Sequence, residues 1–309
     1  MASKLYWDVC IPKLCYGFEI FDINEENLSS IETFHTKKAK MFQMFPQFSS
    51  NCGSRATIGW VSLEAFIHYM QIMFMYRIML LPVTSLYKSI FIRRFFNVQE
   101  NNGGNGPMCN FIKTCKKYNL LEFITDCVMS GVYAKYNNIK IKVKEIVFTH
   151  DYQRLCITSK MYKTLSCITL FKAKKHSYIG WWKFALKNPK FFRHCALIVK
   201  LLLNVYRLGN KRCDLCTKMQ ANTVSHILFS CEYNEDVRQD KWKILSDHTC
   251  NNIMRDLEEM NTFERSAYML NMLNGGYIVE WSDMYTSICE FIFEVYQKYY
   301  KEMIHVTND

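Results

Sequence analysis

The stretch Cys213-Asp-Leu-Cys216, followed by His226-Ile-Leu-Phe-Ser-Cys231, places three thiols and one imidazole in a short segment with the spacing Cys-x2-Cys-x9-His-x4-Cys. Three thiolates and an imidazole are a donor set of closed, tetrahedral structural zinc sites. Two residues between the first two cysteines let one tight turn aim both sulfurs at the same point. The pattern therefore predicts one structural Zn²⁺, bound by Cys213, Cys216, His226 and Cys231.

The residues between the last two ligands support this interpretation. His226 and Cys231 lie a little over one helical turn apart, so both can face one ion while Ile227, Leu228 and Phe229 face a core. The alternative is that these thiols are ordinary core residues, because free cysteines are often buried and the chain has 14 of them.

Length and composition indicate a folded, mainly helical protein. The chain has 309 residues, of which 50% are hydrophobic and 15% aromatic, so it can bury a sizeable core. Apolar residues recur at helical spacing over most of its length. We expect a mainly α fold, a multi-helix bundle with a small embedded CCHC zinc module. The predicted segments are a helical region (1–100), a basic helical region (107–206), the zinc module (207–245) and an acidic helical tail (246–309).

Several local signals fix where helices should begin. Asn24 and Ser62 are expected to cap helices that end near Pro46 and Pro82, and Pro107 should open a helix after the Gly/Asn-rich linker. Asp151 is expected to cap another helix.

Two segments are harder to assign from sequence. Residues 11–21 alternate around Gly17, which suggests an extended segment or hairpin. For residues 135–149 the strict alternation of lysine with apolar residues favours a strand, whereas the helical neighbourhood favours a basic helix.

Charge is unevenly distributed along the chain. The net charge is +11, yet residues 152–212 hold 14 Lys/Arg and no acidic residue, whereas residues 213–309 hold 8 Lys/Arg and 16 Asp/Glu. A block of one sign is typical of proteins that bind a polyanion, most often nucleic acid. The alternative is a solvated basic face that the acidic tail covers.

The basic block contains cations and aromatic rings that suit RNA or single-stranded nucleic acid. Lysine and arginine would contact phosphates, and exposed rings would stack on bases. The candidate contacts are Trp181, Trp182, Lys183, Lys187, Lys190, Arg193, Arg207, Lys211 and Arg212, with Tyr178 and Phe192 as further stacking candidates. Tryptophans and phenylalanines at helical spacing are more often core residues than stacking platforms.

Three blocks of the sequence resemble the region after the catalytic palm in reverse transcriptases of non-LTR (LINE-type) retrotransposons. They are Ile11-Pro-Lys-Leu-Cys-Tyr-Gly-Phe-Glu19, Ala56-Thr-Ile-Gly-Trp60, and the segment from Cys213 to Cys231 with its Thr-Val-Ser-His-Ile-Leu-Phe-Ser-Cys half. The resemblance implies a helical thumb followed by a zinc-binding knuckle, which in an intact element grips template RNA or target DNA beside the polymerase.

The family's polymerase needs paired aspartates that hold two metal ions, and this sequence contains no Asp-Asp pair. We therefore expect a non-catalytic, nucleic-acid-binding fragment of a retrotransposon reverse transcriptase, not an enzyme, whose partners are RNA, DNA or the rest of a retroelement polymerase. The alternative is a zinc-stapled structural or protein-interaction protein with no nucleic-acid role.

The cysteines also indicate a compartment. The first residues lack the apolar core of a signal peptide, and ligand thiols must stay reduced, so we expect an intracellular protein, nuclear or cytoplasmic. The apolar run from Phe66 to Pro82 contains His68, Gln71 and Arg77, which favours a buried helix over a membrane span.

Overall fold

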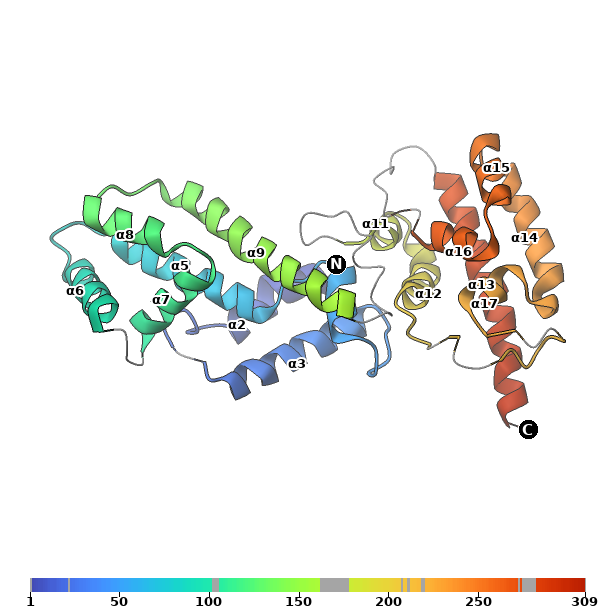
Figure 1. Cartoon of the computed structure of the whole chain (residues 1–309), viewed down its shortest axis with the longest axis horizontal. Coiled ribbons are helices and arrows are strands. Elements are labelled where there is room, and N and C mark those ends of the chain that lie inside the picture. The colour runs from blue at the N-terminus through green and yellow to red at the C-terminus, as the bar shows by residue number, and fades with distance from the viewer. Residues whose placement is uncertain are drawn as a thin grey trace. The chain divides into compact units, whose positions relative to one another are not determined.

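A computed structural model describes residues 2–21, 23–101, 106–161, 178–206, 208–209, 212–217, 220–271, 273 and 282–308. Within these ranges the chain is helical, with two isolated β-bridges and no strand (Figure 1). The mainly α prediction is confirmed, and the Cys3His segment is embedded among helices as expected.

The chain forms two compact units, a coarser division than the four predicted segments. The first unit holds residues 1–42 and 60–155, and the second holds 43–59 together with the described residues from 156 to the C-terminal helix. No boundary falls at the Gly/Asn-rich linker, because α7 (Pro107–Lys117), which follows it, packs against α5 (Leu63–Met79) and α6 (Leu86–Asn101), which precede it.

The first unit is a helical bundle around one hydrophobic core. Its elements are α1 (Ala2–Leu5), the π-helical turn η1 (Tyr6–Cys10), α2 (Ile11–Leu14), α3 (Glu25–Phe42), α5 (Leu63–Met79), α6 (Leu86–Asn101), α7 (Pro107–Lys117), α8 (Leu121–Ser130) and α9 (Tyr136–Met161, in this unit through Leu155). Residues from α5 to α9 form its core, among them the fully buried Tyr76, Phe95 and Cys115.

The predicted helix starts of this unit are largely correct. The Asn24 side chain accepts a hydrogen bond from the Asn27 N–H at 2.8 Å, and Ser62 Oγ accepts one from the Ala65 N–H at 3.1 Å. Pro107 occupies the first turn of α7.

Two segments of the first unit correct or complete the sequence prediction. Residues 11–14 are helical and not extended, because Ile11 and Cys15, four residues apart, are both buried, which is helical spacing. Residues 136–161 form the single helix α9, which resolves the open choice for the lysine-rich segment. Ile139, Val143 and Val147 repeat every four residues and are buried.

The sequence predicts that Asp151 caps a helix that starts beside it. It lies instead inside α9, and its carboxylate binds the N-cap residue of α5. Its carboxylate accepts hydrogen bonds from the Ser62 N–H at 2.9 Å and from Ser62 Oγ at 2.7 Å. Arg154 donates to the same carboxylate at 3.1 Å and to Glu64 at 2.5 Å. A buried carboxylate is stable only when its oxygens are paired in this way. Asp151 therefore ties α9 to the start of α5.

The second unit combines an N-terminal helix with the C-terminal helices. Its elements are α4 (Asn51–Thr57), α11 (Gly180–Lys187), the 3-10 turn η3 (Pro189–Phe191), α12 (Phe192–Leu202), α13 (Val224–Phe229), the 3-10 turn η4 (Glu232–Asn234), α14 (Glu235–Asp247), α15 (Asn251–Glu259), α16 (Thr262–Asn271) and α17 (Ser282–Asn308). The predicted acidic tail is thus part of this core, because α17 packs against α12, α13 and α14.

Three hydrogen bonds explain why α4 belongs to the second unit. Gln43 is buried, and its side-chain oxygen accepts hydrogen bonds from Thr57 Oγ1 and from Trp182 Nε1, at 2.5 and 2.9 Å. The Ile179 N–H donates to the Thr57 carbonyl at 3.0 Å. These bonds hold α4 against the start of α11.

Gly180 marks a very close approach within the second unit. A Cβ at this position would collide with the backbone of Leu273, and the neighbouring Trp181 donates its indole N–H to the Leu270 carbonyl at 2.6 Å. Only glycine permits this contact, so α11 is seated directly on the end of α16.

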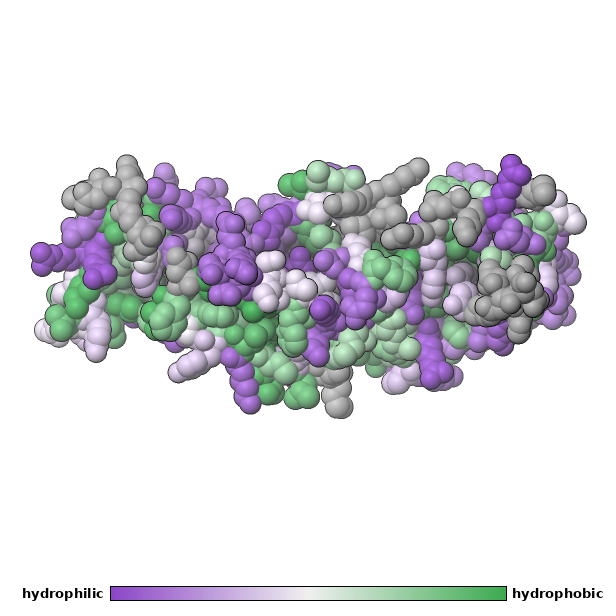
Figure 2. All heavy atoms as spheres, turned by 90° about the horizontal axis from the view of Figure 1, so that it is seen from below, coloured by the Kyte–Doolittle hydropathy of each residue, from purple (hydrophilic) through white to green (hydrophobic). Residues whose placement is uncertain are grey.

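The surface carries no sign of a membrane span in the described ranges. None of their helices is both long and apolar enough to cross a bilayer. Hydrophilic side chains are scattered between hydrophobic ones on the face shown in Figure 2. The apolar run in α5 is explained by burial, since Ile72, Met73 and Met79 are almost completely covered.

We predict that Asp151→Ala destabilises the first unit by about 1–3 kcal/mol, because the change leaves the buried Ser62 N–H without its acceptor. Chemical denaturation followed by circular dichroism measures the loss. Asp126→Ala on the exposed face of α8 is the control and should leave stability within about 0.5 kcal/mol of the wild type. Equal stability of the two variants would contradict the role given to Asp151.

Candidate metal centre

Backbone pairing brings the first cysteine next to the helix that carries the histidine. The Cys213 N–H donates to the Gln220 carbonyl at 2.9 Å, Arg212 and Ala221 form an antiparallel bridge, and the Gly209 N–H donates to the Asn222 carbonyl. Gly209 has φ +95°, a conformation that glycine adopts readily. The segment before Cys213 therefore runs back along the segment that leads into α13.

Thr223 positions the histidine through a helix cap. Its Oγ1 accepts a hydrogen bond from the His226 N–H at 3.1 Å, which fixes the first turn of α13. At the other end of the helix, the Cys231 N–H donates to the His226 carbonyl at 2.7 Å. In the Thr-x-x-His-x4-Cys segment, Thr223 therefore caps the helix and His226 lies in its first turn. The chain then turns back after the helix, so that Cys231 lies next to His226.

The four predicted ligand residues converge. Their donor atoms all lie within 4.8 Å of one another, with the Cys213 and Cys231 sulfurs 3.8 Å apart and Cys216 Sγ 3.5 Å from His226 Nε2. A disulfide needs about 2.05 Å between its sulfurs, so the 3.8 Å pair is not one. Cys213, Cys231 and His226 are buried, and Cys216 is half-buried. This group could hold a metal ion.

Gln220 selects the nitrogen of His226 that faces the cysteines. Its side-chain oxygen lies 3.1 Å from His226 Nδ1. Because a carboxamide oxygen can only accept, the ring proton belongs on Nδ1, and the Nε2 lone pair then points toward Cys216. A partner on the second ring nitrogen is the usual support of a metal-binding histidine.

Burial makes the Cys231 thiol a weak acid in the absence of a metal ion. Burial, followed by the neighbouring Cys213, raises the pKa of Cys231 to about 12. Without a cation the Cys231 thiol therefore stays protonated at neutral pH, and binding a metal ion must release its proton. Affinity at this site should consequently fall as the pH is lowered.

Tyr299 supplies a hydroxyl that suits a metal-bound thiolate. It projects from α17, is 2% exposed, and its hydroxyl faces the Cys213 thiol without closing a hydrogen bond of ordinary geometry. Burial, and next the adjacent Cys213, raise the pKa of the phenol, so it keeps its proton. An unpaired buried hydroxyl costs free energy, and a thiolate at Cys213 is an acceptor within its reach. This orphaned donor is an independent sign that the donor set fits a cation.

The ligand helix is also part of the core of the second unit. Ile227 and Leu228 are completely buried, and α13 packs against α16 and α17. Phe229, half-buried, stacks on Phe291 of α17 with ring centroids 5.7 Å apart. The expectation that the residues between His226 and Cys231 face a core is therefore met.

Among the predicted nucleic-acid contacts, the described cations are exposed and the tryptophans are not. Lys183 and Lys187 lie four residues apart on the outer face of α11, Lys190 lies in η3, and Arg193 is the second residue of α12. All four are exposed, as is Arg212. No ion pair to any of the five is found within the described part of the chain. Arg207 and Lys211 lie outside the described residues.

The stacking role predicted for Trp181 and Trp182 is wrong for this conformation. Their exposed fractions are 0% and 4%, and both indole N–H groups are used, toward Leu270 and Gln43. Neither ring offers a face to a base. Phe192 is half-buried with its ring 5.3 Å from Trp182, and Tyr178 is half-buried as well.

Sequence reasoning missed two supporting residues, Gln220 and Tyr299. Gln220 lies inside the x9 gap, where spacing alone gives no signal, and Tyr299 is far away in sequence in the C-terminal helix. Comparison of the chain with protein-family models, curated proteins and solved structures finds no match.

We predict that Tyr299→Phe weakens metal binding by about tenfold, the effect typical of removing a partner of a ligand. Titration with Co²⁺, whose thiolate charge-transfer band reports on the Cys213 ligand, gives both the affinity and a band shift that a change in folding alone does not produce. Tyr300→Phe, one residue further along α17, is the control, because Tyr300 is half-exposed and removing its hydroxyl should leave affinity and band unchanged. Identical spectra for the two variants would contradict the hydrogen bond.

Proposed function

We propose that this chain is a non-catalytic nucleic-acid-binding protein whose basic surface on α11, η3 and the start of α12 contacts phosphates, next to a structural zinc site. The observation that carries the proposal is the acid-free block of residues 152–212, whose described lysines and arginines are exposed at the four positions from Lys183 to Arg193 and again at Arg212. Exposed cations without local counter-charges are the footprint of a polyanion partner.

The geometry of the ligand group favours zinc as its metal. A tetrahedral zinc with Zn–S bonds of about 2.3 Å and a Zn–N bond of about 2.0 Å separates two sulfurs by about 3.8 Å, and a sulfur from the nitrogen by about 3.5 Å. The Cys213–Cys231 and Cys216–His226 separations are 3.8 and 3.5 Å. Four protein donors leave no open position, so the metal would have a structural role. It would fix Arg212, which directly precedes the first ligand.

The acidic C-terminal segment argues against the alternative of a self-neutralised interaction protein. Two of the ion pairs found for it in the described part of the chain join α14 and α17, between Lys241 and Glu294 at 2.8 Å and between Lys298 and Asp236, and a third, between Arg238 and Glu235, lies within α14. These three carboxylates pair within the segment itself, and none of the pairs uses a cation of α11.

The resemblance to non-LTR retrotransposon reverse transcriptases supports the same partner class. In that family a thumb and a zinc knuckle hold nucleic acid beside the polymerase. We propose that this chain plays the corresponding part with RNA or DNA, either alone or with the remainder of a retroelement polymerase, inside the cell.

We predict one zinc ion per chain in protein purified without chelators, measured by plasma mass spectrometry. Cys213→Ser and Cys231→Ser should each lose most of the metal and destabilise the second unit, since binding free energy at such a site is folding free energy. Cys250→Ser, at an exposed cysteine outside the group, is the control and should retain full zinc content. Metal-free wild-type protein with normal folding would rule the site out.

For nucleic acid, we expect binding that weakens steeply with salt. The double charge reversal Lys183→Glu with Lys187→Glu should lower affinity for a single-stranded oligonucleotide at least tenfold. It should also reduce the slope of log affinity against log salt by about 0.7 for each lost phosphate contact. Fluorescence anisotropy across a salt series measures both quantities, for RNA and DNA separately.

The matched control for this test is Lys140→Glu with Lys144→Glu, an exposed pair with the same spacing on α9 of the first unit. It changes the net charge equally. If the two double variants weaken oligonucleotide binding equally, the affinity depends only on the total charge of the protein, and the proposed binding surface is wrong. Binding that is absent at low salt would remove the nucleic-acid function altogether.

A further inference from the structure

Three tyrosines of the second unit form a ring cluster that no part of the proposed function uses. Tyr206 follows α12, and Tyr296 and Tyr300 lie four residues apart on the same face of α17. The ring centroid of Tyr206 lies 5.4 Å from that of Tyr296 and 6.3 Å from that of Tyr300. The Tyr296 and Tyr300 rings are 6.1 Å apart and nearly parallel, at 14°. All three separations lie in the range of interacting aromatic pairs.

The cluster is buried on its inner side and open on its outer side. Tyr296 is 4% exposed, Tyr206 is half-buried, and Tyr300 is 47% exposed. Burial, and next the neighbouring Tyr300, raise the pKa of Tyr206 to about 12, so its phenol is uncharged at neutral pH. The two inner rings hold Tyr300 in place, so little conformational entropy is lost when another flat group stacks on its exposed side.

The same turn of α17 also contacts the metal centre. Tyr299 faces the Cys213 thiol, and the Lys298 ammonium nitrogen lies over the ring of Tyr233 in η4, 4.8 Å from its centroid. The residues on either side of this contact therefore tie α17 to both ends of the ligand segment. Tyr300, the next residue, is fixed relative to the metal module by these contacts.

The exposed groups around Tyr300 carry a net positive charge. Lys301 follows Tyr300 directly and is exposed, as is Arg212, which precedes the first ligand. Neither has an ion pair within the described ranges. Asp214, the exposed residue after that ligand, is acidic, so these three groups sum to +1. An aromatic ring bordered by cations matches a base that is followed by its phosphate.

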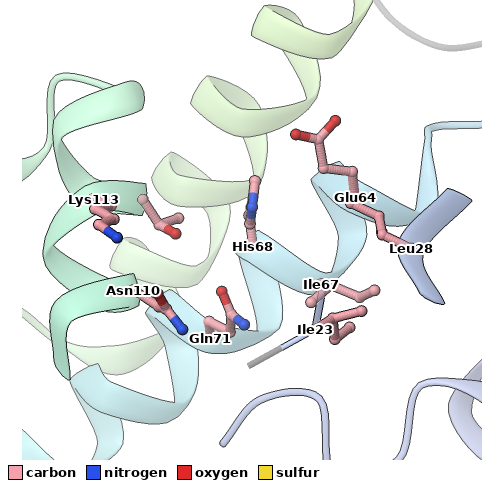
Figure 3. A pocket seen from close by; sticks show the side chains of 9 residues that line it. Ile23, Leu28, Glu64, Ile67, His68, Gln71, Asn110 and Lys113 are labelled. Carbon is pink, nitrogen blue, oxygen red and sulfur yellow. The ribbon is translucent and has the colours of Figure 1, made fainter. Parts of the chain in front are cut away.

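A hollow in the first unit offers a much poorer surface for a base. Among the side chains that line it, shown in Figure 3, His68 is the one that carries a ring. The Nδ1 of this imidazole lies 2.9 Å from the Tyr118 hydroxyl, and the two rings meet edge-on at 68°. Polar groups such as Glu64 and Gln71 border the rest of the hollow. Base stacking is therefore expected at α17 and not at this hollow.

We propose that Tyr300, held by Tyr296 and Tyr206, is a stacking platform for an unpaired base of a single-stranded nucleic acid. This inference rests on the proposed nucleic-acid function and supplies the aromatic contact that the buried tryptophans cannot make. Every base has a flat aromatic face, so the platform would bind unpaired bases without reading their sequence. A double helix would not use it, because its bases are already stacked on one another.

Fluorescence anisotropy of the full chain with oligothymidylate, and with an abasic strand of the same length, tests this platform. The two strands carry the same phosphates, so we expect the wild type to bind oligothymidylate about fivefold more tightly or better. Tyr300→Ala should lower the affinity for oligothymidylate by about fivefold or more, as loss of one base–aromatic stack does, and leave the affinity for the abasic strand unchanged. That unchanged affinity also shows that the variant is folded. Tyr300→Phe keeps the ring and should bind both strands as the wild type does.

Phe263→Ala is the control, because Phe263 is 71% exposed on α16 of the same unit and lies outside the cluster. It should leave both affinities unchanged. The platform is ruled out if Tyr300→Ala binds oligothymidylate as tightly as the wild type, or if the two alanine variants lose affinity equally. If the wild type binds both strands equally and the charge reversal at Lys183 and Lys187 still weakens them, the nucleic-acid function stands and only the platform is rejected. Binding to neither strand removes both.

Discussion

The short helix α13 has to pack its apolar residues in the core and at the same time direct His226 toward the cysteines. The structure of the second unit depends on this double requirement. One of its faces carries Ile227 and Leu228 into a core built from α16 and α17, while His226 turns toward three cysteines. Rotating the helix would bury the imidazole among apolar groups or withdraw it from the sulfurs. Core packing and ligand convergence therefore select the same orientation, and the Thr223 cap fixes where the helix begins.

Much of the fold and the ligand set could be predicted because the responsible signals are local. Ser62 and Pro107 act on the residues next to them, and the Cys-x2-Cys spacing predicts a single turn. The sequence predicts a local helix cap at Asp151 and misses its bond to Ser62, because Ser62 is distant in sequence and only the tertiary structure brings the two residues together. The burial of Trp181 likewise depends on Leu270, which no periodicity could reveal.

The two units treat their charges in different ways. In the first unit, Glu64, Asp151, Lys117 and Arg154 form a compact network at the junction of three helices, where each charge has a partner. In the second unit, cations gather on the exposed side of α11, and acidic groups pair between α14 and α17. Charged residues thus stabilise the helix junction of the first unit, whereas those of α11 form an exposed cationic surface in the second.

Gly180 has a consequence for how that surface could be dissected. Because its backbone lies directly against Leu273, a single added methyl group must push the start of α11 away from Leu273, and Lys183 and Lys187 would move with the helix. Gly180→Ala thus displaces the cationic surface without altering its composition. A charge substitution changes both the number of positive charges and their positions. Gly180→Ala changes only their positions.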